Sequence, residues 1–468
     1  MQVDEVLNNQ KNSMIRMTAS IFFIDLFNIL VNNVDQLMIS HYSQTAVAAV
    51  GNANQISWVL MLLLTVLSNA TVILVTQYKG AKSEELVKKT YAVALVSNII
   101  LGIVLGLVFI FFGRGIFAIM NVKDPEILNY AYEYIAITGG GTVFMALIMS
   151  YSAFFRSNAM MKEALIITII VNVLNIIGNW LLIYGVGPFP ELGVIGVAVS
   201  TVAARAIGTI LLIIVFRKKI GRIEFKLLKP FPKEQLKKLL RIGVPSTGEN
   251  FSYDAAQLVI MGFINAMGLV AVNSKIYVYL VVQAAYLFTS SLSEAMQVTE
   301  GYLLGAKRHD EANKRVMRSL ALGIVVSAVL TTLIWVFSDQ IIGLFLSGTD
   351  PNIIELRAEI LSLCKTILMI DIILESGRAI NFIMVRALQT AGDIKFPVIM
   401  CIIFSWFFSV GCGYILGVAL GYGLAGIWIG MMLDECLRGV VLSIRWKRGG
   451  WRKIDLVSEK EFEAIQAE

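Results

Sequence analysis

The amino-acid sequence predicts an all-α membrane protein with twelve transmembrane helices in two pseudo-symmetric six-helix lobes. One observation behind this prediction is composition: 57% of the 468 residues are hydrophobic and 15% are charged, which is too apolar for a soluble globular chain. The others are a series of long apolar runs and a similarity between the two halves of the chain. Together they indicate an internally duplicated membrane protein.

Twelve apolar runs cover residues 14–40, 46–77, 87–112, 127–155, 164–186, 192–216, 240–267, 270–298, 316–337, 357–388, 396–418 and 424–446. Each is long enough to cross a bilayer core, which takes about 20 helical residues, and none alternates like a barrel strand. We therefore expect an N-lobe over 1–216, a cytoplasmic basic linker over 217–241 that runs into the seventh helix, a C-lobe over 242–448 and a cytoplasmic tail over 449–468. The tail beyond Trp451 is expected to be frayed or amphipathic.

Three groups of residues recur in the second half at a nearly constant offset. The Gly-Ala-Lys sequence at 80–82 recurs at 305–307, which is 225 residues later. At an offset of 230, Arg156 recurs as Arg386, and the pair Gly193 and Gly196 recurs as Gly423 and Gly426. Three correspondences in the same order favour a duplication over chance.

The basic residues predict the orientation of the helices. Most of the 39 Lys and Arg residues lie at the N-terminus, in the connections after even-numbered helices, or in the tail. By the positive-inside rule, both termini are expected in the cytoplasm of a protein of the plasma membrane. The net charge of +6 then reflects topology and contact with anionic lipid, and no nucleic-acid partner is expected. No signal-peptide cleavage site is apparent.

Several kinds of chemistry have no motif in this chain. There is no Gly-Lys dipeptide for a Walker A loop and no HExxH sequence, so neither ATP hydrolysis nor metalloprotease chemistry is expected. The four cysteines lack ligand spacing and are interpreted as small apolar side chains: Cys364, Cys401, Cys412 and Cys436. We predict that the protein is not an enzyme.

Polar and charged residues inside the first-half helices point to a cation. Asp35 shares a helix face with Asn28 and Asn32, because these residues recur at helical spacing. The fifth run carries Asn172, Asn175 and Asn179 at the same spacing, and the sixth carries Thr201 and Arg205. Amides in membranes commonly serve only as hydrogen bonds between helices. Adding the ionisable Asp35 favours a site for a monovalent cation or a proton.

The second half carries more charge inside its helices than structure alone requires. Seven acids face two arginines there: Glu249, Asp254, Glu294, Asp371, Glu375, Asp434 and Glu435 against Arg378 and Arg438. Glu375 with Arg378, and Glu435 with Arg438, can pair at i, i+3, so simple neutralisation is one interpretation. Asp254 and Glu294 have no obvious local partner and are expected to exchange protons. Asp371 has a competing interpretation as an outer-end residue.

Several sequence segments together resemble the multidrug and toxic compound extrusion (MATE) transporters. They are VNNVDQLMIS at 31–40, TQYKGAKSEE at 76–85, NIIGNWLLIYG at 175–185, LGVIGVAVSTVAAR at 192–205, GVP at 243–245 and RALQTAGDIKFP at 386–397. The resemblance implies twelve helices around a central cavity and export of organic compounds against an inward flow of Na⁺ or H⁺. The first loop with Arg156 lacks the family's Gly-Asp, which we expect to affect loop geometry.

The resemblance also implies site residues. The N-lobe cation site would comprise Asp35, Asn175, Asn179 and Thr201, which could hold Na⁺; the family has Asp or Asn at the third of these positions. In the C-lobe, the positions of Asp254 and Glu375 lie close to two acids that some members use for a cation. We add Glu294 and Arg378 as C-lobe candidates, because they are charges inside helices.

The predicted function is secondary active antiport. The protein is expected to export amphipathic, cationic small molecules in exchange for Na⁺ or H⁺ by alternating access, as a monomer in the bilayer, with no cofactor besides the coupling ion. The alternative is a flippase for lipid-linked saccharides from the same superfamily. Such proteins often carry cavity arginines, for which only Arg205, Arg378 and Arg438 qualify here. A receptor or channel is less compatible with the duplication and the buried carboxylates.

Overall fold

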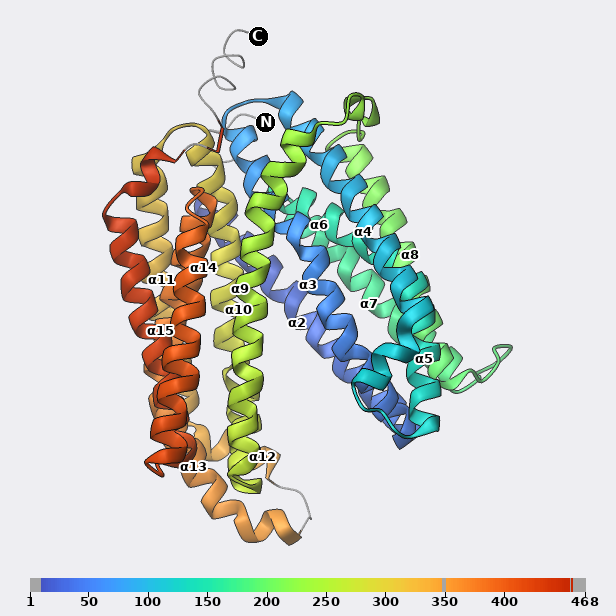
Figure 1. The fold of residues 1–468 in the computed structure, drawn as a ribbon, viewed down its shortest axis with the longest axis vertical. Helices are drawn as coiled ribbons and strands as arrows, with labels where there is room; N and C mark the ends of the chain where they lie inside the picture. The colour runs from blue at the N-terminus through green and yellow to red at the C-terminus, as the bar shows by residue number, and fades with distance from the viewer. Residues whose placement is uncertain (1–9, 347–350, 455, 458–468) are drawn as a thin grey trace. The chain divides into compact units, whose positions relative to one another are not determined.

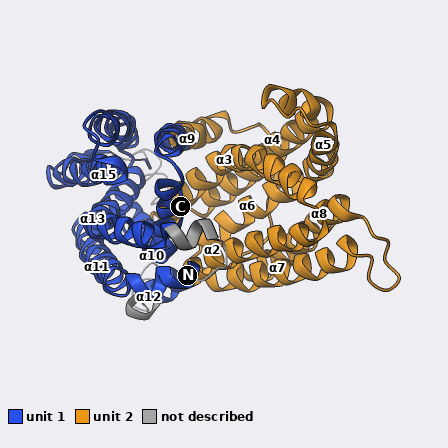
Figure 2. Cartoon of the chain, turned by 90° about the horizontal axis from the view of Figure 1, so that it is seen from below, with its two compact units in different colours: residues 1–19, 245–468 blue, residues 20–244 orange. Residues whose placement is uncertain are grey.

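The computed structural model describes residues 10–346, 351–454 and 456–457, and this part of the chain contains helices and no strand. It divides into two compact units, shown in different colours in Figure 2. Unit 2 comprises Ser20–Val244, and unit 1 comprises the residues from Pro245 onward together with the described residues before Ser20. The prediction of an all-α chain is confirmed.

Unit 2 contains the first six predicted spans, which can be followed from blue to light green in Figure 1. Its helices are α2 (Gln10–Tyr42), α3 (Gln44–Gly80), α4 (Glu84–Ile119), α5 (Pro125–Gly140), α6 (Thr142–Ser157), α7 (Met161–Ile183) and α8 (Gly193–Lys219). The predicted run 127–155 is thus a pair of helices, bent by 51° at Gly141. A Cβ atom on Gly141 would lie 2.5 Å from Val202, so only glycine fits where this bend meets α8.

Unit 1 contains the other six predicted spans. Its elements are α9 (Lys233–Ala266), α10 (Leu269–Gly305), α11 (His309–Val336), α12 (Ser338–Phe345), α13 (Pro351–Thr390), α14 (Lys395–Phe404), η2 (Ser405–Cys412), η3 (Ile415–Ala419), α15 (Gly423–Lys447) and η4 (Gly450–Lys453). The helices α14, η2 and η3 form one continuous span in which the turns widen to π-helix, a geometry that is frequent at functional sites.

Eight of the described helices are long and apolar enough to cross a membrane, or nine if α5 and α6 form one bent span. The three long helices outside this count are α9, α13 and α15, which carry most of the charges that the sequence places inside second-half helices. Charges inside a span are costly in a bilayer unless they are paired. These three helices are therefore where function is to be sought in unit 1.

The duplication is visible in the backbone hydrogen bonds of two corresponding turns. After α3, the amide of Ala81 donates to Gln77 O at 2.9 Å, and after α10 the amide of Ala306 donates to Tyr302 O at 3.1 Å. The lysines that follow both adopt a left-handed backbone, with φ of 63° at Lys82 and 58° at Lys307. The offset of 225 residues therefore relates equivalent positions in the two units.

The correspondence of Arg156 with Arg386 is wrong by three residues. The amide of Ala159 donates to Arg156 O at 2.9 Å, and the matching bond in unit 1 runs from Gly392 to Gln389 O at 3.1 Å. The counterpart of Arg156 is thus Gln389, at an offset of 233. Pairing one arginine with the other chose Arg386, which precedes the true counterpart Gln389 by three residues, almost one helical turn. The two turns are alike in backbone conformation, and an arginine is not needed for it.

The loop of unit 2 that follows Arg156 has a left-handed residue at the equivalent position without the family's glycine. Ala159 adopts a left-handed backbone with φ of 56°, as Gly392 does with φ of 90° in the equivalent turn. A residue with a Cβ atom in this region costs about 1–2 kcal/mol. The expected change of loop geometry is therefore absent, and the alanine accepts backbone strain in its place.

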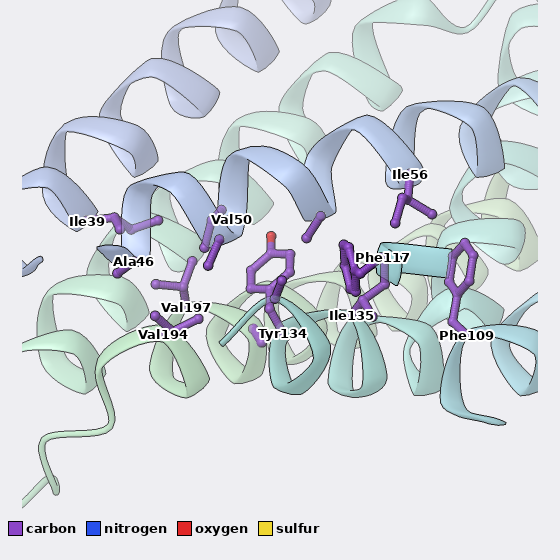
Figure 3. Close-up of a cluster of buried hydrophobic side chains, with 14 of the residues drawn as sticks. Ile39, Ala46, Val50, Ile56, Phe109, Phe117, Tyr134, Ile135, Val194 and Val197 are labelled. Carbon is purple, nitrogen blue, oxygen red and sulfur yellow. The ribbon is translucent and has the colours of Figure 1, made fainter. Parts of the chain in front are cut away.

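Each unit has its own apolar core. In unit 2, side chains from α2, α3, α4, α5 and α8 pack together around Val50 and Tyr134, as Figure 3 shows. In unit 1, a second cluster joins α9, α10, α13 and α15 around Ile367 and Ile427. These cores hold the helices that carry the charged residues described below.

The basic segment between the sixth and seventh spans packs on unit 2. Its Glu224 forms an ion pair with Lys88 at 2.9 Å, and Gln235 Nε2 donates to Thr90 Oγ1 at 2.6 Å. The predicted linker 217–241 thus comprises the end of α8, the short helix η1 (Phe225–Leu228) and the first turns of α9. The helix then continues through Pro245, where the two units are divided.

The described residues from Trp451 onward pack on other parts of unit 1. Trp451 is 2% exposed and stacks on Trp446, with ring centroids 4.1 Å apart. Arg452 forms an ion pair with Asp310 on α11 at 2.9 Å. Residues 458–468 lie outside the described part of the chain.

Candidate coupling sites in the two units

Asp35 lies at the centre of a polar cluster in unit 2. Asn179 Nδ2 on α7 donates to Asp35 Oδ1 at 2.6 Å. The amide of Asn175 is best satisfied with its nitrogen 3.3 Å from both Asp35 oxygens and its oxygen accepting from Thr201 Oγ1 at 3.3 Å. Three helices, α2, α7 and α8, thus bring together all four residues that the family resemblance assigned to the N-lobe site.

Other side chains complete this cluster, and sequence reasoning missed two of them. Ser200 Oγ donates to the backbone oxygen of Asn175 at 2.9 Å, which ties α8 to α7. Arg205 is close enough to interact electrostatically with both Asp35 and Tyr134. Ser200 adjoins the predicted Thr201, whereas nothing in the spacing of its own helix indicates Tyr134.

The cluster has the composition of a site for a hard monovalent cation. Its oxygens are one carboxylate, two amides and two hydroxyls, the ligand types that hard cations prefer. Asn179 is fully buried and its Oδ1 atom has no hydrogen-bond partner among the described residues. A buried oxygen without a partner raises the free energy of the folded protein unless a cation or a hydrogen-bond donor binds it. The residues therefore fit a bound cation such as Na⁺.

Unit 1 contains a different kind of cluster, in which arginines join the acids. Arg378 bonds Glu375 on its own helix α13, and its Nε atom lies 3.3 Å from Glu435 Oε1 on α15. Arg438 contacts the same Glu435 at 3.2 Å and Asp434 at 3.0 Å. The two i, i+3 pairs expected from sequence are present, and Glu435 joins them into one network.

Neutral donors satisfy the remaining oxygens of Glu435 and Asp434. Asn381 Nδ2 donates to Glu435 Oε2 at 2.5 Å, and Tyr253 on α9 donates to Glu435 Oε1 at 3.4 Å. Ser409 Oγ, on the π-helical segment η2, donates to Asp434 Oδ2 at 2.8 Å. The network therefore joins four elements, α9, α13, η2 and α15.

Asp371 belongs to this network and lies against α15. Its side chain is 2% exposed, and Trp428 Nε1 on α15 donates to Asp371 Oδ1 at 3.1 Å. Asp371 precedes Glu375 by four residues, one helical turn along α13. Asp371 lies near the middle of the predicted run 357–388, and α13 extends beyond that run at its start.

The other two predicted C-lobe residues are Glu294 and Asp254. Glu294 on α10 pairs with Arg386 on α13 at 3.7 Å. That partner lies on another helix and could not be found from local spacing. Asp254 is half-buried next to Tyr253 on α9 and points about 100° away from it around the helix. The contact of α9 with Glu435 runs through Tyr253 instead.

One buried acid escaped the sequence analysis. Glu300 on α10 is fully buried, and neither of its carboxylate oxygens has a hydrogen-bond partner among the described residues. It lies just beyond the predicted run 270–298, where the sequence suggested the edge of the membrane. The structure extends this helix to Gly305.

The family model described as MatE matches this chain over residues 20–181 and 245–415. These two segments lie in the two units described above. The part of the chain between them contains α8, η1 and the first turns of α9.

Curated relatives match nearly the full length. The uncharacterized transporter YisQ of Bacillus subtilis (strain 168) is 34% identical over 441 residues, which cover 94% of each chain. A protein of Thermotoga maritima named probable multidrug resistance protein NorM is 25% identical over 433 residues, covering 92% of this chain and 90% of that one.

Solved structures share the fold. A crystal structure described as MATE in the bent conformation aligns with a TM-score of 0.85 at 18% identity, covering 99% of this chain and 98% of the other. A MOP superfamily transporter from Pyrococcus furiosus, described as having a binding pocket of reverse polarity, aligns with a TM-score of 0.82 at 20% identity and covers 95% of this chain and 97% of that one. The predicted fold of twelve helices in two lobes is confirmed.

Proposed function

Because this chain belongs to the MatE family of membrane transporters, we propose that it is a secondary active antiporter that exports amphipathic, cationic small molecules in exchange for Na⁺ or H⁺. It is a multi-pass membrane protein and a transporter rather than an enzyme. Relatives named as multidrug resistance proteins support export of drug-like compounds.

The observation that carries the proposal is the Asp35 cluster. It offers one carboxylate and a buried amide oxygen on Asn179 that has no hydrogen-bond partner in the described part of the chain, inside a span of a transporter. A bound cation shifts a conformational equilibrium only by its difference in affinity for the two states. A cluster built from three separate helices supplies such a difference, because any relative movement of α2, α7 and α8 changes its geometry.

We further propose that the protein resides in the plasma membrane as a monomer, with both termini in the cytoplasm. The distribution of basic residues supports this orientation, since Lys and Arg concentrate at the termini and in the connections after even-numbered spans. In this orientation the docked Trp451 segment and the linker with Gln235 lie on the cytoplasmic side.

The contacts of the buried arginines weigh against the saccharide flippase. A flippase for lipid-linked saccharides needs positive charge that is free to meet a phosphate. Arg378 is bonded to Glu375 and Glu435, and Arg438 to Glu435 and Asp434. Both guanidinium groups are thus engaged by carboxylates.

Transport under defined gradients tests the proposal. The purified full-length protein is reconstituted into liposomes, and the movement of a fluorescent organic cation is followed under an imposed Na⁺ gradient, an imposed H⁺ gradient, or neither. We expect uphill transport with at least one gradient and none without. Equal rates in all three conditions would contradict antiport, and transport of a lipid-linked saccharide without a gradient would favour the flippase.

A further inference from the structure

The segment that joins α8 to α9 is strongly basic. Residues 217–241 contain ten Lys and Arg against two Glu. Six of the basic side chains are exposed and form no ion pair with a described residue: Arg222, Lys226, Lys229, Lys233, Lys237 and Arg241. Much of the positive charge of this segment is therefore unmatched within the described part of the chain.

The two acids of the segment do not balance this charge. Glu224 is paired with Lys88 on α4 at 2.9 Å, and Glu234 lies exposed in the first turn of α9. The acid nearest the end of α8, Glu163 on α7, is already paired with Lys219 at 2.6 Å. Within the segment, Glu234 alone is left against the six exposed basic side chains.

Two aromatic side chains are exposed among these basic residues. Phe225, the first residue of η1, is 55% exposed, and Phe231 is 41% exposed. The segment has other apolar side chains that pack inward, because Leu227 and Leu228 are half-buried and Leu239 is fully buried. The two phenylalanines therefore present apolar surface where the residues around them are charged.

Contacts with unit 2 hold the segment in place on both sides of the phenylalanines. Before them, Glu224 is paired with α4; after them, Gln235 Nε2 donates to Thr90 Oγ1 at 2.6 Å and Lys238 Nζ donates to Tyr78 OH at 3.3 Å. In Figure 1 the segment lies at the end of unit 2 where α3 turns into α4. The phenylalanines and lysines are thus displayed on a docked surface.

We propose that residues 222–241 are a lipid anchor, which binds the anionic phospholipids of the cytoplasmic leaflet. Phe225 and Phe231 insert among the headgroups, and the six exposed basic side chains bind the phosphates. Aromatic residues bordered by Lys and Arg are typical of segments that lie in the membrane interface. Each basic residue near an anionic leaflet adds to the attraction.

A membrane surface fits this segment better than a soluble acidic partner. The span α8 ends in Arg217, Lys218 and Lys219, and basic residues at the end of a span lie at the level of the headgroups. Phe225 follows Lys219 by six residues, so the anchor begins close to the lipid phosphates. An acidic protein or a nucleic acid would match the charge, but the interface also removes the phenylalanines from water.

The lipid anchor is continuous with a helix that reaches the charged network of unit 1. α9 begins at Lys233 within the anchor and carries Tyr253, which donates to Glu435 at 3.4 Å. Lipid bound to the first turns of α9 therefore acts on a helix of that network, and we expect the rate of export to depend on the fraction of anionic lipid. This step rests on the proposed transport function, whereas lipid binding does not.

Photocrosslinking of the full-length protein in lipid nanodiscs tests the anchor without any transport. p-Benzoylphenylalanine, which bonds to neighbouring C–H groups on illumination, replaces Phe225 or Phe231. The nanodiscs contain phosphatidylglycerol and phosphatidylcholine in equal amounts, and intact-mass spectrometry identifies the attached lipid. We expect lipid adducts at both positions. Phosphatidylglycerol should be favoured by at least about 5-fold, the gain expected from one basic residue at an anionic headgroup.

Two other aromatic positions are controls for the probe. Phe111 is 73% exposed inside the span α4, where it should attach both lipids equally. Phe189 is 43% exposed in the connection between α7 and α8, and residues 184–192 contain no Lys or Arg. Any adducts at Phe189 should therefore show no preference for phosphatidylglycerol.

A triple variant tests the contribution of charge. Lys226→Gln, Lys229→Gln and Lys233→Gln are combined with the probe at Phe225. Because all three lysines are exposed, the fold should be unaffected. We expect lipid adducts to persist and the ratio of phosphatidylglycerol to phosphatidylcholine to fall to near 1.

A second triple variant removes the same net charge from unit 1. It combines Lys314→Gln, Arg318→Gln and Lys453→Gln, all at exposed positions, with the probe at Phe225. The preference for phosphatidylglycerol should then remain at the wild-type level, since none of the three residues belongs to the lipid anchor.

Several results would overturn the lipid anchor. If Phe111 forms lipid adducts and neither Phe225 nor Phe231 does, the phenylalanines face water. Equal amounts of the two lipids at Phe225 would exclude the anionic preference, and an equal fall in both triple variants would assign it to net charge alone. A protein adduct in place of lipid, when illumination is repeated in cell membranes, would assign the segment to a protein partner. If gradient-driven export fails while anionic lipid is favoured as expected, the antiport is wrong and the lipid anchor stands.

Discussion

The two units share a duplicated frame but place very different charges at their centres. In unit 2, one carboxylate, Asp35, is surrounded by amides and hydroxyls from three helices. In unit 1, four carboxyl groups are bound to two arginines on α13 and α15. The carboxylate of the first cluster has Arg205 within electrostatic reach, whereas the acids of the second cluster are bound directly to two arginines.

This difference predicts different consequences of mutation. Charges that neutralise one another inside a membrane protein are part of the packing, so losing one leaves another buried without compensation. A single carboxylate that is hydrogen-bonded to amides, with Arg205 near it but in no direct ion pair with it in the described part of the chain, is expected to contribute more to ligand binding than to the fold. We therefore expect mutations in the charged network of unit 1 to lower the stability of the protein. Mutations in the Asp35 cluster of unit 2 are expected to lower its affinity for the coupling cation.

The largest effect is expected for Arg438→Met. This change leaves Glu435 and Asp434 without one of their ion-pair partners while preserving most of the side-chain volume. Breaking a buried pair from one side costs about 3–5 kcal/mol. Thermal unfolding of the purified protein should show a clear drop in the midpoint. Arg357→Met, at an exposed position of α13, is the control, and an equal midpoint in both variants would contradict the structural role of Arg438.

We expect Asp35→Asn to weaken binding of the coupling cation and to leave the stability of the fold nearly unchanged. At an effective dielectric constant of about 20, a charge about 5 Å from a cation contributes about 3 kcal/mol. We therefore expect a fall of roughly 100-fold in affinity for the coupling cation, loss of gradient-driven export, and an unfolding midpoint close to the wild type. Glu191→Gln, an exposed acid of the same unit, is the control. Export at the wild-type rate would remove Asp35 from the coupling mechanism.

Thr201→Val should weaken the same site by a smaller amount. The substitution keeps the shape of the side chain and removes the hydroxyl that lies 3.3 Å from Asn175. A neutral oxygen contributes about 1 kcal/mol, which corresponds to a loss of about 5-fold in cation affinity. Thr201→Ser restores the oxygen and should restore the affinity. Binding of the cation can be measured by calorimetry, and equal affinities in both variants would exclude Thr201 as a ligand.

The smallest effects on stability are expected for substitutions in the two equivalent turns that contain Ala159 and Gly392. Ala159→Gly relieves a left-handed alanine and should stabilise the protein by up to about 1 kcal/mol. Gly392→Ala introduces the same strain and a Cβ atom 2.8 Å from Ile454, and should destabilise by at least as much. Unfolding midpoints that move in the same direction in both variants would contradict the equivalence of these turns.

The sequence predicted those features of the structure that are set within a single helix, such as its length and the spacing of its side chains. Helices cover all twelve predicted apolar runs, and the spacing of Glu375 with Arg378 predicted a pair that the structure contains. The bend at Gly141 was missed because an apolar run looks the same whether its helix is straight or broken. The partner of Glu294 was missed because it lies 92 residues away, on α13.

The sequence by itself determined that this protein spans a membrane, that its halves are duplicated, and that Asp35 shares a cluster with Asn175, Asn179 and Thr201 through its family resemblance. Helical periodicity and hydrophobic length are properties of a local segment and can be read from it. Only the tertiary structure decided that Asp371 is buried beside Glu375 and that Glu435 joins two arginines. These contacts depend on how α13 and α15 face each other, and packing between helices leaves no periodic signal in either one.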